Sequence, residues 1–188
     1  MHTIQWMVCV ENLPQIIKKC PHCGCERYEN SGRFRVNANG SKLDVWLIFR
    51  CINCKSSWNM RVYDRVDRAY LNKTEYAALM QNDMLLVRRV AFDRATLLRN
   101  SVSIDFGSAV LRIDGSAVPP GEAAEVALVS EYALDLPTGA VIAEKLGVSR
   151  SRVRKLAESG MLSVPGGVKK RKVGFGFRFT LGKGWSPD

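Results

Sequence analysis

The chain has 188 residues, which is enough for one ordinary hydrophobic core or for two or three small units. Apolar residues make up 46% of the chain, as in globular proteins, and no apolar run approaches the roughly 20 residues of a membrane-spanning helix. These features argue against a membrane protein, and we expect a soluble, cytoplasmic one.

The formal net charge of +10 is unevenly distributed. Residues 1–70 carry 11 basic and 6 acidic side chains, residues 71–137 carry 6 and 9, and residues 138–188 carry 11 and 3. Two basic ends therefore flank an acidic middle. This pattern favours a polyanionic partner, most often nucleic acid, although a solvated basic surface would give the same counts.

After a predicted strand at residues 4–10, four of the six cysteines form two Cys-x2-Cys pairs. Two residues between thiolates let both sulfurs of a tight turn face one ion, so the doubled spacing is typical of a structural zinc site. We therefore predict one structural Zn²⁺ per chain. Its expected ligands are Cys20, Cys23, Cys51 and Cys54.

Other interpretations of these cysteines stay open. They could form disulfides or be buried thiols, but residues 1–19 do not resemble a secretory signal. Cys25 or His22 could replace a member of the ligand set, although the symmetrical pairing favours the four residues given above. Cys9 is interpreted as a small buried apolar residue.

The residues around the second pair have the pattern of a zinc ribbon. Residues 33–37 and 43–50 are rich in β-branched and aromatic residues, and Asn39-Gly40 between them is a hairpin-turn signal. Residues 57–63 alternate apolar with polar and predict a third strand. The predicted zinc ribbon spans residues 1–66.

Residues 67–120 are predicted to form a helical connector with a β-hairpin. Asn72 with Glu75 resembles a capping pair for a helix to residue 80, and an apolar stripe predicts a second helix over about 83–100. Apolar and polar residues alternate over residues 101–114, which suggests the hairpin. Pro119-Pro120-Gly121 suggests a linker. Residues 122–134 fit either a helix or a strand.

The last predicted domain, residues 121–188, contains a pair of short helices. Gly147 supplies the turn between them and Ser149 caps the second, whose basic residues cannot be buried together unpaired. A basic run and an alternating strand at 175–179 follow, which suggests a hairpin against the helices. The candidate nucleic-acid-binding residues are Arg150, Arg152, Arg154, Lys155, Lys169, Lys170, Arg171 and Lys172.

Two segments give the chain a resemblance to an uncharacterised bacterial family, domain of unknown function 1062. They are GRFRVNANGSKLDVWLIFRCINC, followed by SSWN, and LGVSRSRVRKLAESG. That family implies no established activity. The overall expectation is an α+β protein with an N-terminal β-rich zinc ribbon, a helical middle and a small C-terminal α+β module.

Residues 135–182 also resemble the alpha-L RNA-binding motif of ribosomal small-subunit protein S-four and of pseudouridine synthases. The resemblance rests on Leu146-Gly147, Ser149-Arg150-Ser151, Leu156 and Gly160, with a basic segment behind them. It implies a module that docks its second helix and hairpin on folded RNA. The chain differs from the motif at Pro137-Thr138 and at Val164-Pro165-Gly166.

The expected function is therefore non-enzymatic binding of nucleic acid, with structured RNA favoured over DNA and contacts within residues 138–182. Two alternatives remain: a DNA-binding helix-turn-helix regulator, whose winged form needs a helix at 122–134, and a protein-interaction scaffold that docks a partner on the zinc ribbon. Catalysis is not expected, because no His-based acid–base pair, phosphate loop or small-molecule substrate site is evident.

Overall fold

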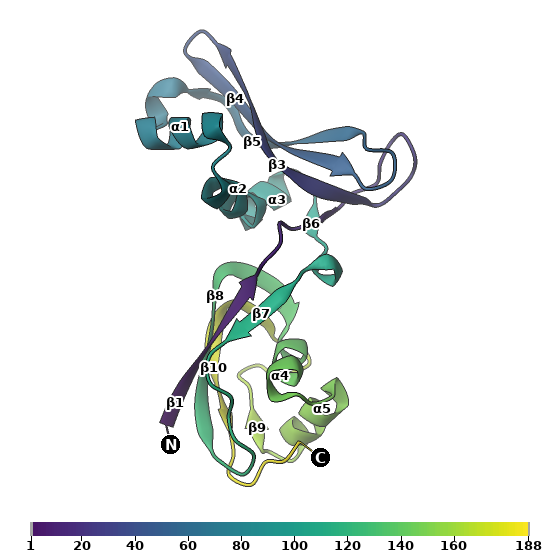
Figure 1. Cartoon of the computed structure of the whole chain (residues 1–188), viewed down its shortest axis with the longest axis vertical. Coiled ribbons are helices and arrows are strands. Elements are labelled where there is room, and N and C mark those ends of the chain that lie inside the picture. Colours follow the sequence, from purple (N-terminus) through teal and green to yellow (C-terminus); the bar gives the residue numbers. More distant parts are fainter. Residues whose placement is uncertain (1, 188) are drawn as a thin grey trace. The chain divides into compact units, whose positions relative to one another are not determined.

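The computed structural model describes residues 2–187, which form an α+β protein of two compact units (Figure 1). One unit is Asn12–Ala109; the other combines the chain up to Glu11 with the chain from Val110 onward. This grouping differs from the predicted division into residues 1–66, 67–120 and 121–188. The reason is long-range strand pairing, which attaches the first strand to the C-terminal part of the chain.

The Asn12–Ala109 unit is built on a five-stranded sheet with the order β5-β4-β3-β2-β6. All of its pairings are antiparallel. The strands are β2 (Ile16–Ile17), β3 (Arg27–Asn39), β4 (Lys42–Cys51), β5 (Ser57–Asp67) and β6 (Ser103–Ile104). The strand β5 is therefore an edge of the sheet.

The predicted hairpin is present as β3 and β4. Asn39 pairs with Lys42, and Gly40 between them has a φ of 60°, a left-handed conformation that glycine adopts at little cost. Alternate residues of β4 are buried, from Leu43 to Cys51, and this face packs against the helices of the unit. The strand therefore delivers Cys51 at the end of a buried row.

Three α-helices and a short 3-10 helix follow β5, and the α-helices lie on one side of the sheet (Figure 1). They are η1 (Arg68–Tyr70), α1 (Lys73–Gln81), α2 (Met84–Ala91) and α3 (Arg94–Arg99). The prediction of one helix over 83–100 was wrong. Asp93 accepts a hydrogen bond from the Thr96 N–H and starts α3 as a new helix, as Asp83 does for α2.

The second unit has a mixed sheet with the order β7-β1-β8-β10-β9. Its strands are β1 (His2–Val10), β7 (Leu111–Asp114), β8 (Ala124–Pro137), β9 (Leu162–Ser163) and β10 (Lys172–Leu181). The strand β1 runs parallel to β8 and antiparallel to β7. Trp6 from β1 and Phe179 from β10 meet edge to face in its core, with ring centroids 5.5 Å apart.

Helices α4 (Thr138–Leu146) and α5 (Arg150–Glu158) complete this unit. As predicted, Gly147 ends the first helix with a left-handed φ of 67°, and Ser149 accepts a hydrogen bond from the Arg152 N–H to cap the second. Val141, Ile142 and Val153 are buried between the helices and the sheet side of the unit. In α5 the buried residues are Val153 and Leu156, and Arg150, Arg154 and Lys155 are exposed.

Two predicted hairpins differ in the structure. Residues 101–114 do not pair with one another: β6 joins β2, the 3-10 helix η2 (Phe106–Ser108) intervenes, and β7 joins β1. The alternating segment 175–179 is part of β10, which pairs mainly with β8. The open question at residues 122–134 is also answered, because Ala124–Pro137 is a strand.

None of the helices among residues 2–187 is long and apolar enough to cross a membrane.

Candidate metal centre and basic surface

The two cysteine pairs lie on two turns of the same construction. The N–H of Gly24 donates to the carbonyl of Cys20 over 2.9 Å, and the N–H of Lys55 donates to the carbonyl of Cys51 over 3.1 Å. Gly24 and Lys55 both have a left-handed φ, of 74° and 61°. The sequence signals this conformation at Gly24, whereas a lysine gives no such signal at the equivalent position of the second turn.

A second hydrogen bond closes each turn. Cys20 donates its N–H to the carbonyl of Cys25 over 2.7 Å, and Cys51 donates to the carbonyl of Ser56 over 2.9 Å. Cys25 thus acts through its backbone. Among the described residues, the group that could hold a metal consists of the four predicted cysteines and includes neither Cys25 nor His22.

The sulfur atoms of Cys20, Cys23, Cys51 and Cys54 all lie within 4.8 Å of one another. Cys20 and Cys54 have their sulfurs 3.7 Å apart, and those of Cys23 and Cys51 are 3.5 Å apart. Four sulfurs around one zinc, at about 2.3 Å from the ion, stand about 3.8 Å apart, whereas a disulfide needs about 2.05 Å. The spacing therefore fits a tetrahedral metal site better than a pair of disulfides.

The surroundings of the cluster also suit a cation. The Ser56 hydroxyl lies 3.3 Å from the Cys20 sulfur, and this hydrogen bond is the main reason that the pKa of Cys20 falls to about 5. Burial acts in the opposite direction on Cys51 and raises its pKa. Several thiolates this close repel one another, so a bound cation would hold all four in the deprotonated form that metals require.

The predicted basic residues of α5 fall into two groups. Arg150, Arg154 and Lys155 are exposed. Arg152 is half-buried, and its guanidinium donates to the Ser186 carbonyl, over 3.1 Å from Nε and 2.8 Å from Nη2, and to the Ser186 hydroxyl over 2.9 Å. Arg152 therefore anchors the C-terminal segment to the helix, while the other three face solvent.

Three contacts place the basic run at residues 169–172, which leads into β10, beside α5, β8 and the start of α4. Lys169 lies 3.8 Å from the carboxylate of Glu158, the last residue of α5, and Lys172 lies 3.3 Å from that of Asp135. Both pairs are at least half exposed, so each contributes little stability. The exposed Lys170 lies between them in the sequence.

Arg171 makes the third contact, and its side chain is half-buried. Its carbonyl accepts a hydrogen bond from the N–H of Thr138 at the start of α4, and its guanidinium lies 4.7 Å from the ring centroid of Phe177. Of the eight predicted nucleic-acid-binding residues, Arg152 and Arg171 thus have structural contacts. Of the remaining cations, Arg150, Arg154 and Lys155 are exposed on α5, and Lys169, Lys170 and Lys172 are exposed in the segment that leads into β10.

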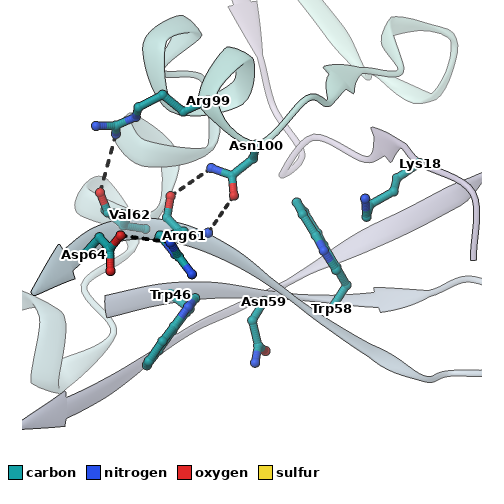
Figure 2. Close-up of a pocket in the computed structure, with 9 residues that line it drawn as sticks. All are labelled: Lys18, Trp46, Trp58, Asn59, Arg61, Val62, Asp64, Arg99 and Asn100. Atoms are coloured by element: carbon teal, nitrogen blue, oxygen red, sulfur yellow. Dashed lines mark hydrogen bonds and ion pairs between the residues drawn. The ribbon is translucent and has the colours of Figure 1, made fainter. Parts of the chain in front are cut away.

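A feature that the sequence did not suggest is a pocket beside β5, with a volume of about 490 Å³ (Figure 2). Trp46 and Trp58 line it together with Lys18, Arg61 and Arg99. The alternation of β4 and β5 places Trp46 on the face away from the core and Trp58 on the core side. No spacing motif marks these residues, because they come from β4, β5, α3 and the segment after β2.

Comparison with known proteins gives one match. No curated protein and no solved structure shows significant similarity to the chain. The family model described as "Protein of unknown function (DUF1062)" matches residues 36–167, which covers the second cysteine pair and the helices α1 to α5 and ends before the basic run at 169–172. With more than two thirds of its length matched, the chain belongs to this family of proteins of unknown function.

Proposed function

We propose that the protein is a non-enzymatic, zinc-containing nucleic-acid-binding protein, and that it contacts structured RNA through residues 138–182. The observation that carries this proposal is the position of the basic run beside the helix pair: the Arg171 carbonyl accepts a hydrogen bond from the Thr138 N–H, and Lys169 lies 3.8 Å from the Glu158 carboxylate. This position supports a single surface formed by exposed cations from two separate stretches of sequence. We call Arg150, Arg154, Lys155, Lys169, Lys170 and Lys172 the basic surface.

The chemistry of the surface suits a phosphate backbone. Its ion pairs are exposed, so a phosphate can replace the carboxylate partners without leaving a buried charge unpaired. Arg and Lys contacts to phosphate supply affinity that depends on salt and little on sequence. Affinity for folded RNA as a class is therefore expected, with weak preference among sequences.

RNA is favoured over duplex DNA by what precedes the helix pair. A winged helix-turn-helix requires a helix before it, but residues 124–137 form the strand β8, which pairs with β1 and β10. A helix pair followed by a basic segment and a strand is the arrangement that the alpha-L resemblance implies. This supports the RNA-binding alternative.

Zinc is the metal that the cluster suits best. All four candidate donors are cysteine sulfurs, and four thiolates complete a tetrahedron with no open position for water or substrate. Such a centre fixes the ends of β2, β3, β4 and β5 in one place and performs no chemistry. We therefore assign the metal a structural role.

The test compares two double variants of the zinc-loaded full chain. Lys169→Ala with Lys170→Ala removes two cations of the basic surface, and Lys73→Ala with Arg94→Ala removes two exposed cations of the other unit. The first variant should weaken binding to every folded RNA tested and lower the slope of log K against log salt by about 0.7–0.9 per lost contact. The second should leave both unchanged.

Equal effects of the two double variants would contradict the proposal, because they would reflect net charge alone. Tight binding to one duplex DNA sequence, without binding to RNA, would favour the helix-turn-helix alternative. Absence of binding to both RNA and DNA would contradict the proposal and favour the alternative of a scaffold that docks a protein partner on the zinc ribbon. Circular dichroism spectra of both variants serve as the folding control.

A further inference from the structure

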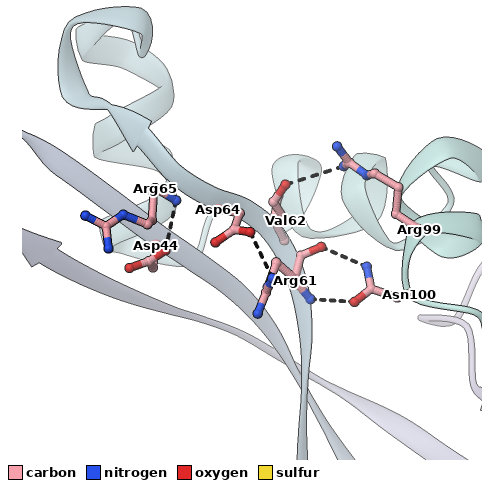
Figure 3. Close-up of polar contacts among 7 residues, drawn as sticks. All are labelled: Asp44, Arg61, Val62, Asp64, Arg65, Arg99 and Asn100. Atoms are coloured by element: carbon pink, nitrogen blue, oxygen red, sulfur yellow. Dashed lines mark hydrogen bonds and ion pairs between the residues drawn. The ribbon is translucent and has the colours of Figure 1, made fainter.

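The pocket beside β5 lies at an edge of its sheet, so part of its wall is unpaired backbone. Arg61 of β5 pairs with Trp46 of β4. The backbone N–H and carbonyl of Arg61 point away from β4 and form hydrogen bonds with the Asn100 side chain. The Arg61 N–H donates to Oδ1 over 2.9 Å, and Nδ2 donates to the Arg61 carbonyl over 2.8 Å (Figure 3). The amide of Asn100 thus replaces a neighbouring strand at that residue.

The same geometry identifies the unpaired part of the edge. Backbone hydrogen bonds alternate in direction along an antiparallel strand, so Asn59, two residues before Arg61, also directs its N–H and carbonyl outward. Beyond Arg61, Arg99 donates to the Val62 carbonyl over 3.4 Å, and the Arg65 N–H is taken up by the Asp44 carboxylate of the neighbouring strand β4, so neither group is available to a ligand (Figure 3). Among the described residues of β5, the open positions thus lie at its start, at Ser57 and Asn59.

The short opening decides between two kinds of ligand. A peptide that adds to a sheet as a new strand needs several consecutive outward-facing residues. Register shifts in β5 near Val62 and Arg65, together with the closure by Asn100, interrupt such an edge. One outward N–H and carbonyl pair at Asn59 instead matches the adjacent acceptor and donor on the edge of a single nucleobase.

The side chains around this opening combine aromatic rings with positive charge. Figure 2 shows Trp46 and Asn59 on one side of the strand and Trp58 with Lys18 on the other. The Lys18 ammonium lies 4.8 Å from the Trp58 ring centroid. Indole rings are good surfaces for stacking a base, and nearby cations are suited to its phosphate.

Charge in the pocket is net positive. Lys18, Arg61 and Arg99 contribute three cations, and Asp64 is the one acidic residue that lines the described pocket. Asp64 pairs with Arg61 over 2.9 Å, but both side chains are more than half exposed, so the pair is weak and can open to a phosphate. An uncharged aromatic ligand would make no use of these cations.

We propose that this pocket binds a nucleotide, with its base against the Trp46 indole, its base edge at the Asn59 backbone, and its phosphate at Arg61, while Lys18 and Arg99 add positive charge to the pocket. The volume of about 490 Å³ lies within the range of small-molecule sites, roughly 300–1,000 Å³. The nucleotide can be free or part of a single strand. The proposal does not depend on the basic surface, since its residues belong to Asn12–Ala109.

Equilibrium dialysis of the full chain with adenosine 5′-monophosphate, and with an oligoadenylate of about eight nucleotides, tests the proposal. Trp46→Leu removes a ring that is not part of the core, and Arg61→Gln removes a cation; each should weaken binding about five-fold or more. Asp64→Asn should tighten binding about two-fold by freeing Arg61. Arg94→Gln, an exposed residue outside the pocket, is the matched control.

The two ligands distinguish the sources of the nucleotide. Equal affinity for both indicates a free nucleotide, and at least ten-fold tighter binding of the oligoadenylate indicates a single strand. Lack of saturable binding of either ligand would overturn the proposal, and so would binding that Arg61→Gln and Trp46→Leu leave unchanged. Binding of an acidic peptide in place of both nucleotides would overturn it as well.

Discussion

Arg152 and Arg154 lie two residues apart on α5, but their surroundings differ. Arg152 bonds Ser186, whereas Arg154 belongs to the exposed basic surface. Replacing each by glutamine removes the charge with almost no change in helix propensity. We predict that Arg152→Gln lowers stability and preserves RNA affinity. Arg154→Gln should preserve stability and weaken RNA binding.

The magnitude follows from the contacts. Arg152 makes three hydrogen bonds at 2.8–3.1 Å to the carbonyl and hydroxyl of Ser186, and a hydrogen bond with a charged group contributes about 1.5–3 kcal/mol. Since the three bonds share one donor group near the end of the chain, we expect about 1–2 kcal/mol for the set. For a unit of this size the melting temperature should fall by about 5–15 °C.

Arg154→Gln should change stability by no more than about 0.5 kcal/mol, as for other exposed positions. It should lower the salt slope of RNA binding by about 0.7–0.9 for one lost phosphate contact. Thermal unfolding followed by circular dichroism, and fluorescence anisotropy of a labelled RNA hairpin at several salt concentrations, measure the two effects. A loss of RNA affinity in Arg152→Gln that equals the loss in Arg154→Gln would refute this division of roles.

Three further predictions concern the fold and the metal. Metal analysis should find one zinc per chain, lost in Cys54→Ser together with a lower melting temperature but retained in Cys25→Ser; equal zinc content in both variants would exclude the four-cysteine assignment. Gly176→Ala should cost roughly 3 kcal/mol or more, because the new Cβ would stand 2.1 Å from a carbonyl oxygen of β8, whereas Gly184→Ala meets no atom within 4 Å and should cost about 1 kcal/mol in a urea titration. Burial raises the pKa of Tyr63 to about 12, so on raising the pH the unfolded state loses the Tyr63 proton before the folded state does. The free energy of unfolding should therefore fall as the pH rises from about 10 to 12. Tyr63→Phe should reduce this fall in urea unfolding experiments at these pH values.

The cysteine cluster and the helix pair are the parts of the molecule that the sequence predicts best. Doubled Cys-x2-Cys spacing constrains the chain strongly, because only turns of one shape can bring such pairs to one ion. Gly147 and Ser149 likewise mark the end of α4 and the start of α5 through local conformation alone. In each case the signal lies within a few residues of the structure it specifies.

Pairing between strands far apart in the sequence accounts for most of the differences between the predicted and the observed fold. The partner of β1 is β8, more than a hundred residues later, and nothing in residues 4–10 identifies it. β6 and β7 are short and close in sequence, and their apolar alternation resembles that of a hairpin. They nevertheless join different sheets. The pocket beside β5 depends on Asn100 reaching the backbone of Arg61, a contact that no spacing rule predicts.

Crosslinking in cells tests the central proposal most directly. The full chain is irradiated in living cells, its bound nucleic acid is sequenced, and the crosslinked peptides are identified by mass spectrometry. The proposed function predicts RNA attached to peptides from residues 138–182, and the signal should fall in Lys169→Ala with Lys170→Ala. Recovery of DNA alone, or of RNA whose crosslinks do not involve residues 138–182, would contradict it.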